Sequence, residues 1–199
     1  MTDQLNCIIT KFGEQYKNIL ANYYPAHGRT GFTERNLSVN FSRAIEFTSA
    51  DAFSWYEVPL SNKKAHYDAM VVDKEDRNIY IIESKRFSNP PKKLREVAED
   101  ISRITDQSNL DMVRKELKMP DKAEYTTYGV ILADVWLETD QKEAIFSHWR
   151  SGTFFDQFKS ELTIAPETMN RIVEPQWFIC EFDEMKSYKL LVLAFRIAD

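Results

Sequence analysis

The sequence contains few of the residues that mark several classes of protein. Among 199 residues it has 5 glycines, 7 prolines and 2 cysteines. So little glycine and proline excludes a collagen-like or low-complexity chain. The cysteines, Cys7 and Cys180, are too few and too far apart for a disulfide scaffold or a zinc knuckle. We therefore expect two free thiols in the core of a protein kept in a reducing compartment.

Long hydrophobic runs and a targeting segment are also missing. The longest apolar stretch, near 189–195, has the length of a strand, whereas a membrane span needs roughly 20 residues. The first residues lack the basic start and the apolar segment of a secretory signal. These absences predict a cytoplasmic protein without a membrane partner.

Positive charge is in deficit over the whole chain. The formal net charge is −5, which argues against general binding to nucleic acid because contact with the phosphate backbone is electrostatic. The distribution is uneven, however. Residues 61–95 hold nine basic and five acidic side chains, a net charge of +4, so the remainder carries −9. The basic charge is therefore concentrated in one segment.

The composition that is present indicates a folded domain with a sizeable core. Hydrophobic residues make up 43% and charged residues 29% of the chain, which excludes disorder, and the length fits one domain. Pro59 marks the first strand as an edge strand or a strand end. Hydrophobic periodicity predicts a mixed α/β sheet with helices on its faces. The predicted helices span 3–24, 91–105, 109–118, 139–149 and 153–162, with another from an N-cap at Thr33 to before 48, and the predicted strands span 54–60, 66–73, 78–85, 125–137, 176–182 and 187–197.

The second and third predicted strands form the most informative part of the sequence. A polar loop of hairpin length, 74–77, lies between them. If these four residues form the turn, Val72 pairs with Ile79, and continuing the pairing places Asp68 opposite Glu83. The Cβ atoms of side chains opposed in this way lie about 4.5–5.5 Å apart. Two carboxylates at that distance repel each other unless a cation lies between them.

Lys85 adds an ammonium group to this pair. It follows Glu83 by two positions, so it projects from the same face of the strand, whereas Ser84 points to the opposite face. Two carboxylates and an ammonium suit phosphodiester hydrolysis. Hard oxygen ligands favour Mg²⁺, which binds through one or two carboxylates and the phosphate of the substrate. The metal lowers the pKa of a bound water, and the lysine stabilises developing negative charge or orients that water.

The pattern of Asp68, a short hairpin and then Glu83-Ser84-Lys85 after an apolar strand resembles the PD-(D/E)XK nuclease superfamily. This superfamily includes restriction endonucleases, archaeal Holliday-junction resolvases and DNA-repair nucleases. The resemblance implies a restriction-endonuclease-like core of helix, three-stranded meander, helix, strand and helix over residues 33–150. An N-terminal helix in 1–32 and a C-terminal helix and hairpin in 151–199 would then be additions within a single domain.

The resemblance also implies roles for individual residues. Asp68 and Glu83 are expected to ligate Mg²⁺, or Mn²⁺ in its place, and Lys85 to serve the nucleophilic water. Glu34 is the candidate for the acid that the family often carries on the preceding helix. It lies three residues before an apolar position and seven before another, so it shares their face. Glu57, in the first strand, is a further candidate ligand, although a structural role is the favoured interpretation.

The resemblance implies a nucleic-acid substrate, most simply DNA cleaved by an endonuclease. A homodimer is compatible with this activity, because cleavage of two strands with one site per chain requires two chains. No phosphate-binding glycine-rich loop is present, so no dependence on ATP is predicted. Basic side chains close to the predicted site are candidates for contact with the phosphate backbone. They are Lys63, Lys64, Arg86, Lys92, Lys93 and Arg95.

Two other interpretations remain open. The chain could be a nuclease-fold module that binds nucleic acid or regulates a partner without catalysis, in which case it need not bind a metal at Asp68 and Glu83. It could also be a protein-interaction domain in which Glu83 and Lys85 form a surface ion pair, which the overall negative charge favours. Asp68 and Glu83 on opposite faces of the sheet would support that last interpretation.

Overall fold

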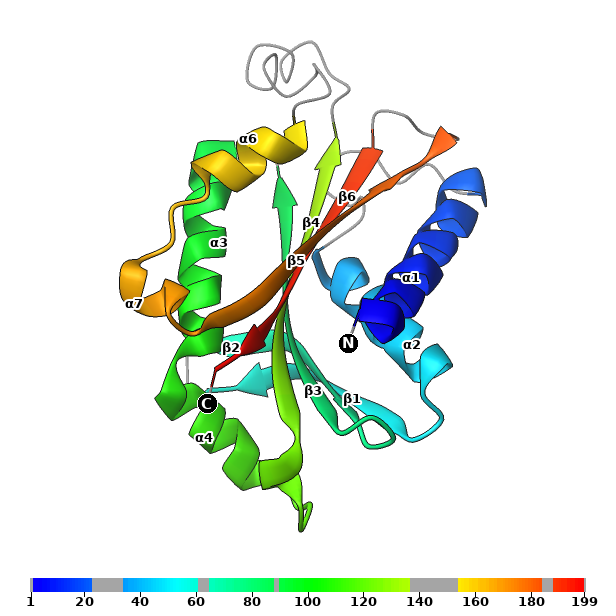
Figure 1. Cartoon of the computed structure of the whole chain (residues 1–199). Helices are drawn as coiled ribbons and strands as arrows, with labels where there is room; N and C mark the ends of the chain where they lie inside the picture. The colour runs from blue at the N-terminus through cyan, green and yellow to red at the C-terminus, as the bar shows by residue number, and fades with distance from the viewer. Residues whose placement is uncertain are drawn as a thin grey trace.

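The centre of the protein is a mixed six-stranded β-sheet with helices on both faces (Figure 1). The computed structural model describes residues 2–22, 34–60, 65–87, 90–136, 154–183 and 188–198. The strand order is β1-β2-β3-β4-β6-β5. The predicted α/β class, with a mixed sheet flanked by helices, is therefore confirmed.

The helices and strands follow the predicted order closely. The helices are α1 (Thr2–Asn22), α2 (Glu34–Thr48), α3 (Pro90–Thr105), α4 (Gln107–Glu116), α6 (Phe154–Glu161) and α7 (Pro166–Met169), with a 3₁₀ turn, η2, at Lys122–Glu124. The strands are β1 (Ala52–Pro59), β2 (His66–Asp73), β3 (Asn78–Phe87), β4 (Thr126–Trp136), β5 (Ile172–Glu181) and β6 (Tyr188–Ile197).

The first three strands form an antiparallel meander, and β4 joins it in parallel. The turn at 74–77 fixes the β2–β3 register, which runs from Asp73 opposite Asn78 to Ala69 opposite Ile82. The predicted register of the hairpin is thus confirmed. A parallel partner requires a crossover, and α3 and α4 supply it between β3 and β4. The position of Pro59 at the end of the edge strand β1 also agrees with prediction.

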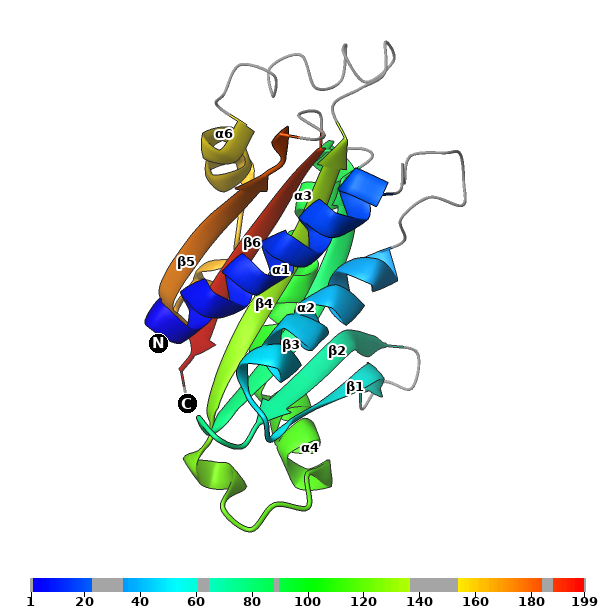
Figure 2. The same ribbon diagram turned by 90° about the vertical axis from the view of Figure 1, so that its right-hand side faces the viewer.

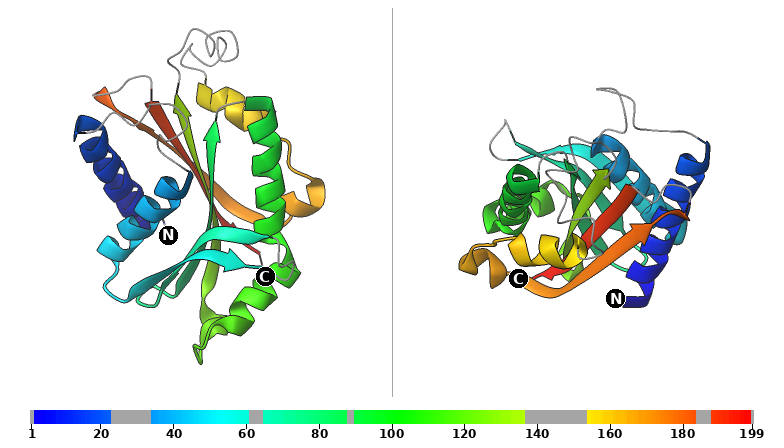
Figure 3. Two further views of the ribbon diagram at one scale, coloured as in Figure 1. Left: turned by 180° about the vertical axis from the view of Figure 1, so that it is seen from behind. Right: turned by 90° about the horizontal axis from the view of Figure 1, so that it is seen from above.

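Two hydrophobic cores lie on the two faces of this sheet. On one face α1 and α2 lie side by side across the strands (Figure 2), where Phe12 and Phe41 are fully buried with their rings 5.3 Å apart. On the other face α3 runs along β3 (Figure 3), where Val97 and Ile101 pack against Ile81. The strict alternation of β3 between the two cores explains its continuous apolar sequence.

Several details differ from the sequence-based expectation. Residues 109–118 were expected to continue the preceding helix, but α4 is separate because the Asp106 side chain caps it by accepting a hydrogen bond from the N–H of Asn109. The short α7 and η2 were not predicted. Cys7 is exposed rather than in the core, because the buried stripe of α1 passes through Leu5 and Ile8 instead. Both cysteines are free, as expected.

Some predicted features lie outside the described residues. These are the N-cap at Thr33, the helix at 139–149 and the two lysines Lys63 and Lys64. No helix in the described part of the chain is long and apolar enough to cross a membrane.

Candidate functional site

The predicted site lies where β1, β2 and β3 separate at one end of the meander. The β1–β2 pairing skips the position at which Glu57 faces Asp68, and the β2–β3 ladder ends at Ala69. Glu57 has a φ of 55°, a left-handed conformation that costs a non-glycine residue free energy. The local break turns the Asp68 side chain towards β3, where its Oδ2 accepts a 2.7 Å hydrogen bond from the N–H of Ser84.

Glu83 of β3 follows the last residue of the β2–β3 ladder and is almost completely buried, with 1% of its surface exposed. Its Oε1 accepts hydrogen bonds from Nη2 of Arg103 at 2.7 Å and from Nε at 3.2 Å. Burial, followed by the negative charges of Asp100 and Asp68, raises the pKa of Glu83 to about 8, although Arg103 acts in the opposite direction. The charge of Asp68 thus acts on Glu83, although the β2–β3 ladder ends before the predicted pairing of these two residues.

Lys85 lies on the same side as Glu83 and is paired with the next helix. Its Nζ is 2.6 Å from Oδ2 of Asp100, and only 14% of the side chain is exposed. Arg103 also binds Oδ1 of Asp100. Four side chains, alternately acidic and basic, are thus joined in sequence, and we call them the buried charge network: Glu83, Arg103, Asp100 and Lys85.

The charge on Lys85 follows from this network. Burial alone would lower the pKa of the Lys85 ammonium, but Asp100, Glu83 and Asp68 together raise it above its usual value. Lys85 is therefore positively charged at neutral pH. In this state it can donate hydrogen bonds or balance negative charge, but it cannot accept a proton.

Asp68 lines a cavity on the side of α2, whereas Glu83 and Lys85 are paired with Arg103 and Asp100 of α3, so the two carboxylates are engaged on different sides of the sheet. Asp68 is half-buried, and burial raises the pKa of its carboxyl above the usual value. The charges of Asp100 and Glu34 raise it too, whereas the hydrogen bond from the N–H of Ser84 and the charge of Lys85 lower it. The cavity has a volume of about 260 Å³. Its lining consists of Glu34, Arg35, Ser38, Glu57 and Asp68.

Ser84 has the structural role expected of it. Its Oγ lies 2.7 Å from Oγ of Ser38 in a buried contact between β3 and α2. The serine therefore faces α2, while Glu83 and Lys85 on either side face α3. This contact fixes the alternation of side chains through the motif.

Glu34 stands at the start of α2, beside this cavity. Its Oε1 accepts hydrogen bonds from the N–H of Arg86 at 2.9 Å and from Nζ of Lys93 at 3.2 Å. Glu34 was predicted to share the inward face of this helix; its side chain is 40% exposed and lines the cavity with Asp68. Its contacts join the start of α2 to the ends of β3 and α3.

The basic residues predicted to bind nucleic acid divide into two groups. Lys93, which is 17% exposed, is held by Glu34 and Glu96, and the half-buried Arg86 donates its N–H to Glu34. Lys92 and Arg95 are exposed on α3, with Lys92 3.6 Å from Glu96. Of the predicted basic residues that the structure describes, Lys92 and Arg95 are therefore the ones whose side chains are exposed to solvent on α3.

Sequence reasoning did not identify Asp100 or Arg103 as members of the site. Asp100 lies within the apolar stripe of α3, between Val97 and Ile104, which are both fully buried. An acidic residue on the buried face of an amphipathic helix is unusual. That position is the signal from which the residue could have been found.

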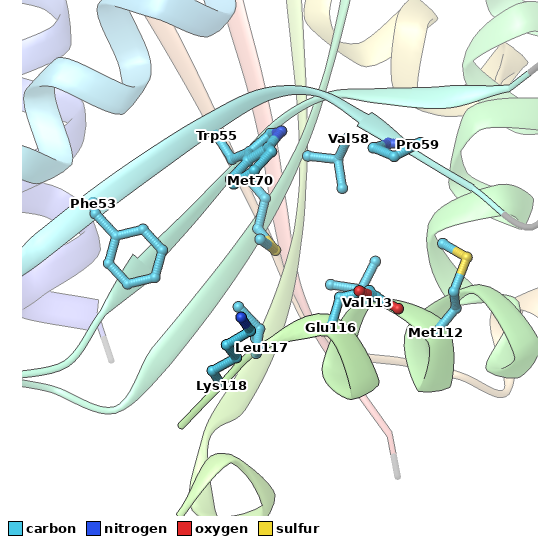
Figure 4. A pocket seen from close by; sticks show the side chains of 10 residues that line it. All are labelled: Phe53, Trp55, Val58, Pro59, Met70, Met112, Val113, Glu116, Leu117 and Lys118. Atoms are coloured by element: carbon cyan, nitrogen blue, oxygen red, sulfur yellow. The ribbon is translucent and has the colours of Figure 1, made fainter. Parts of the chain in front are cut away.

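A second, larger cavity lies on the other side of the meander. It has a volume of about 500 Å³ and lies between β1 and α4 (Figure 4). Trp55 and Val58 both line it, although they are three positions apart in one strand, because the break at Glu57 reverses the alternation of side chains. Its walls are mainly apolar and contain none of the predicted site residues.

Comparison of the chain with protein-family models, curated proteins and solved structures gives no match. Within the described residues, no three His, Cys, Asp or Glu side chains form a group that could hold a metal by themselves. The assignment of a function therefore depends on the chemistry of the site.

Proposed function

We propose that the protein is a metal-dependent nuclease that hydrolyses phosphodiester bonds, with DNA as the expected substrate. One observation carries the proposal: the buried Glu83 and the largely buried Lys85 of β3 lie on either side of Ser84, whose N–H donates a hydrogen bond to Oδ2 of Asp68 in β2. Acidic residues are rarely buried without a partner. The charge of Asp68 adds to burial and to the charge of Asp100 in raising the pKa of Glu83.

Asp68 and Glu83 would hold the metal. Their oxygen atoms are the ligands that Mg²⁺ prefers, and a bound cation would act against burial, Asp100 and Asp68, which raise the pKa of Glu83 in that order. Two protein carboxylates suffice for Mg²⁺, which keeps several waters and binds substrate phosphate. When bound, the metal polarises the phosphoryl oxygen and lowers the pKa of a coordinated water.

The chain's own residues supply the other requirements of the reaction. Lys85 presents a positive charge to the phosphate or to the attacking water. Asp68 borders the cavity shared with Glu34, which orients the ends of β3 and α3 around it. The exposed side chains of Lys92 and Arg95 on α3 would contact the backbone of the nucleic acid.

The order of elements also supports a restriction-endonuclease-like fold. From α2 the chain passes through the meander β1–β3, the helices α3 and α4, and then β4 in parallel with β3. This is the order expected of the PD-(D/E)XK core from its helix to its fourth strand. A homodimer with one site per chain would cleave both strands of a duplex.

One observation favours a second candidate, a nuclease-fold module without catalysis. Glu83 and Lys85 are already paired with Arg103 and Asp100, so the charges of the motif are balanced without a cation. A module of this kind would bind nucleic acid or a partner protein without binding a metal at Asp68. Binding of Mn²⁺ distinguishes the two candidates.

The test is cleavage of supercoiled plasmid and single-stranded DNA with Mg²⁺, Mn²⁺ or EDTA. We expect cleavage with either metal, none with EDTA, and at least a 100-fold lower rate for Lys85→Ala, within the range that loss of a group acting in the transition state produces. Lys11→Ala is the matched control, because Lys11 is an exposed lysine of α1 paired only locally with Glu14. Cleavage that persists in EDTA or in Lys85→Ala would contradict the proposal.

A further inference from the structure

Two charged residues of α3 have no part in the proposed reaction but lie against its motif. Asp100 has a side chain that is only 4% exposed, and Arg103, one turn later, is 28% exposed. A buried carboxylate is costly unless it is paired and hydrogen-bonded. The partners of Asp100 therefore indicate what the residue does.

Each oxygen of Asp100 has its own cationic partner. Oδ1 binds Nη2 of Arg103 at 2.5 Å, and Oδ2 binds Nζ of Lys85 at 2.6 Å. The planar guanidinium of Arg103 also donates hydrogen bonds from Nη2 and Nε to Glu83, so it bridges the two carboxylates. This geometry fixes the rotation of the Asp100 carboxylate and points one oxygen at the lysine.

Lys85 requires such support. A lysine carries its charge on a flexible four-carbon chain with many rotamers. Residues that hold a reacting group in place contribute to the rate by preventing small misplacements. Within the described residues, Asp100 is the acidic group in direct contact with the Lys85 ammonium.

We infer that Asp100 is a positioning residue, held by Arg103, that fixes the Lys85 ammonium at the reaction centre. The inference rests on the proposed nuclease function. Asp100 acts through Lys85 and does not touch substrate. Its removal should therefore affect the rate of the chemical step more than the binding of metal or nucleic acid.

The kinetic test compares Asp100→Asn with wild type on supercoiled plasmid and Mg²⁺. We expect kcat to fall 10- to 100-fold, the usual effect of losing a group that orients a functional side chain. The KM for plasmid and the Kd for Mn²⁺, measured by calorimetry, should change less than threefold. Asp100→Glu keeps the carboxylate and should recover part of kcat. Glu99→Gln is the matched control, because it removes one negative charge from an exposed position next in sequence.

A second measurement tests the contact without any activity. In ¹⁵N-lysine NMR spectra an ion-paired, sheltered ammonium exchanges its protons slowly enough to give a side-chain signal. We expect such a signal for Lys85 in wild type and Glu99→Gln, identified by its absence in Lys85→Arg. It should broaden or disappear in Asp100→Asn. Circular dichroism would confirm that each variant is folded.

The outcomes separate this inference from the proposed function. Wild type that neither cleaves nor binds Mn²⁺ would overturn both. Wild-type cleavage with an unchanged kcat in folded Asp100→Asn would overturn the inference alone. A parallel loss of Mn²⁺ affinity would also overturn it, because Asp100 would then act on the metal site rather than on Lys85.

Discussion

At the scale of single residues, the protonation of Glu83 is the property with the widest consequences. Its pKa is about 8 in the folded protein, against 4.5 for an ordinary glutamate. The folded state therefore holds this proton more tightly than the unfolded chain does. The stabilisation that follows is complete below about pH 4.5 and is lost as the pH rises towards 8.

Glu83→Gln isolates this effect, because glutamine resembles the protonated acid and does not titrate. In EDTA, we expect the free energy of unfolding of wild type to fall relative to that of Glu83→Gln as the pH rises from 5 to 8. Urea denaturation at each pH measures the difference. Glu99→Gln, which changes an exposed acid, should keep the wild-type slope. Parallel curves for wild type and Glu83→Gln would show that Glu83 ionises normally.

Sequence reasoning singled out the residues of the motif but not the residues of α3 that pair with them. The four-residue turn predicted the register from Asp73 opposite Asn78 to Ala69 opposite Ile82, but the predicted pair of Asp68 and Glu83 lies beyond this ladder. Asp100 could not be assigned to Lys85, because that contact depends on how α3 docks on β3. The pairing of Lys93 could not be predicted for the same reason. Lys93 is turned inward by Glu34, a residue 59 positions away.

At the scale of elements, Gly129 in β4 permits a close approach between the sheet and α3. A Cβ built there would lie 2.9 Å from Cγ2 of Ile104 in α3 and closer still to the ring of Phe195 in β6. Because glycine has no side chain, α3, which carries Asp100 and Arg103, can pack directly against the sheet at this position. The glycine supports the site at a distance.

Gly129→Ala should destabilise the protein by about 1–3 kcal/mol through overpacking. Gly13→Ala is the contrasting variant, because the new Cβ would lie 3.6 Å from Sγ of Cys180, an ordinary contact. It should stabilise α1 by up to about 1 kcal/mol, the helical preference for alanine over glycine. Urea denaturation of both variants at one pH gives the comparison. Equal stabilities would contradict the packing described around Gly129.

At the scale of the whole molecule, the order of the meander and the crossover could be predicted from the sequence. The complete order of strands in the sheet could not. The hairpin of β5 and β6 was expected from two adjacent strand patterns, at 176–182 and 187–197. Its insertion beside β4 could not be read from that pattern, because any open sheet edge offers the same backbone groups to a new strand. The break at Glu57 was equally hidden, since it results from the junction of three strands rather than from local sequence.

Metal binding should change the stability of the entire fold if the proposed function is right. A ligand that binds only the folded state stabilises it by about 2.7 kcal/mol at 100 times its Kd. We expect Mn²⁺ to raise the melting temperature of wild type and to leave that of the Asp68→Asn, Glu83→Gln double variant unchanged. The increase should be larger at pH 8 than at pH 6, because at pH 6 the metal must first displace the proton on Glu83. An equal increase in both proteins would place the metal elsewhere.

The parallel pairing of β3 with β4 sets the order in which the molecule can fold. The four-residue turn at 74–77 closes locally, which takes microseconds for a hairpin, and brings Asp68 towards Glu83. The β3–β4 ladder, from Asn78 opposite Thr126 onward, must wait for the long crossover to close. Only then does α3 remove Glu83 and Lys85 from water. Glu83 and Lys85 therefore lose contact with water during the slow step of folding, in which β3 pairs with β4 and α3 docks, and not when the hairpin forms.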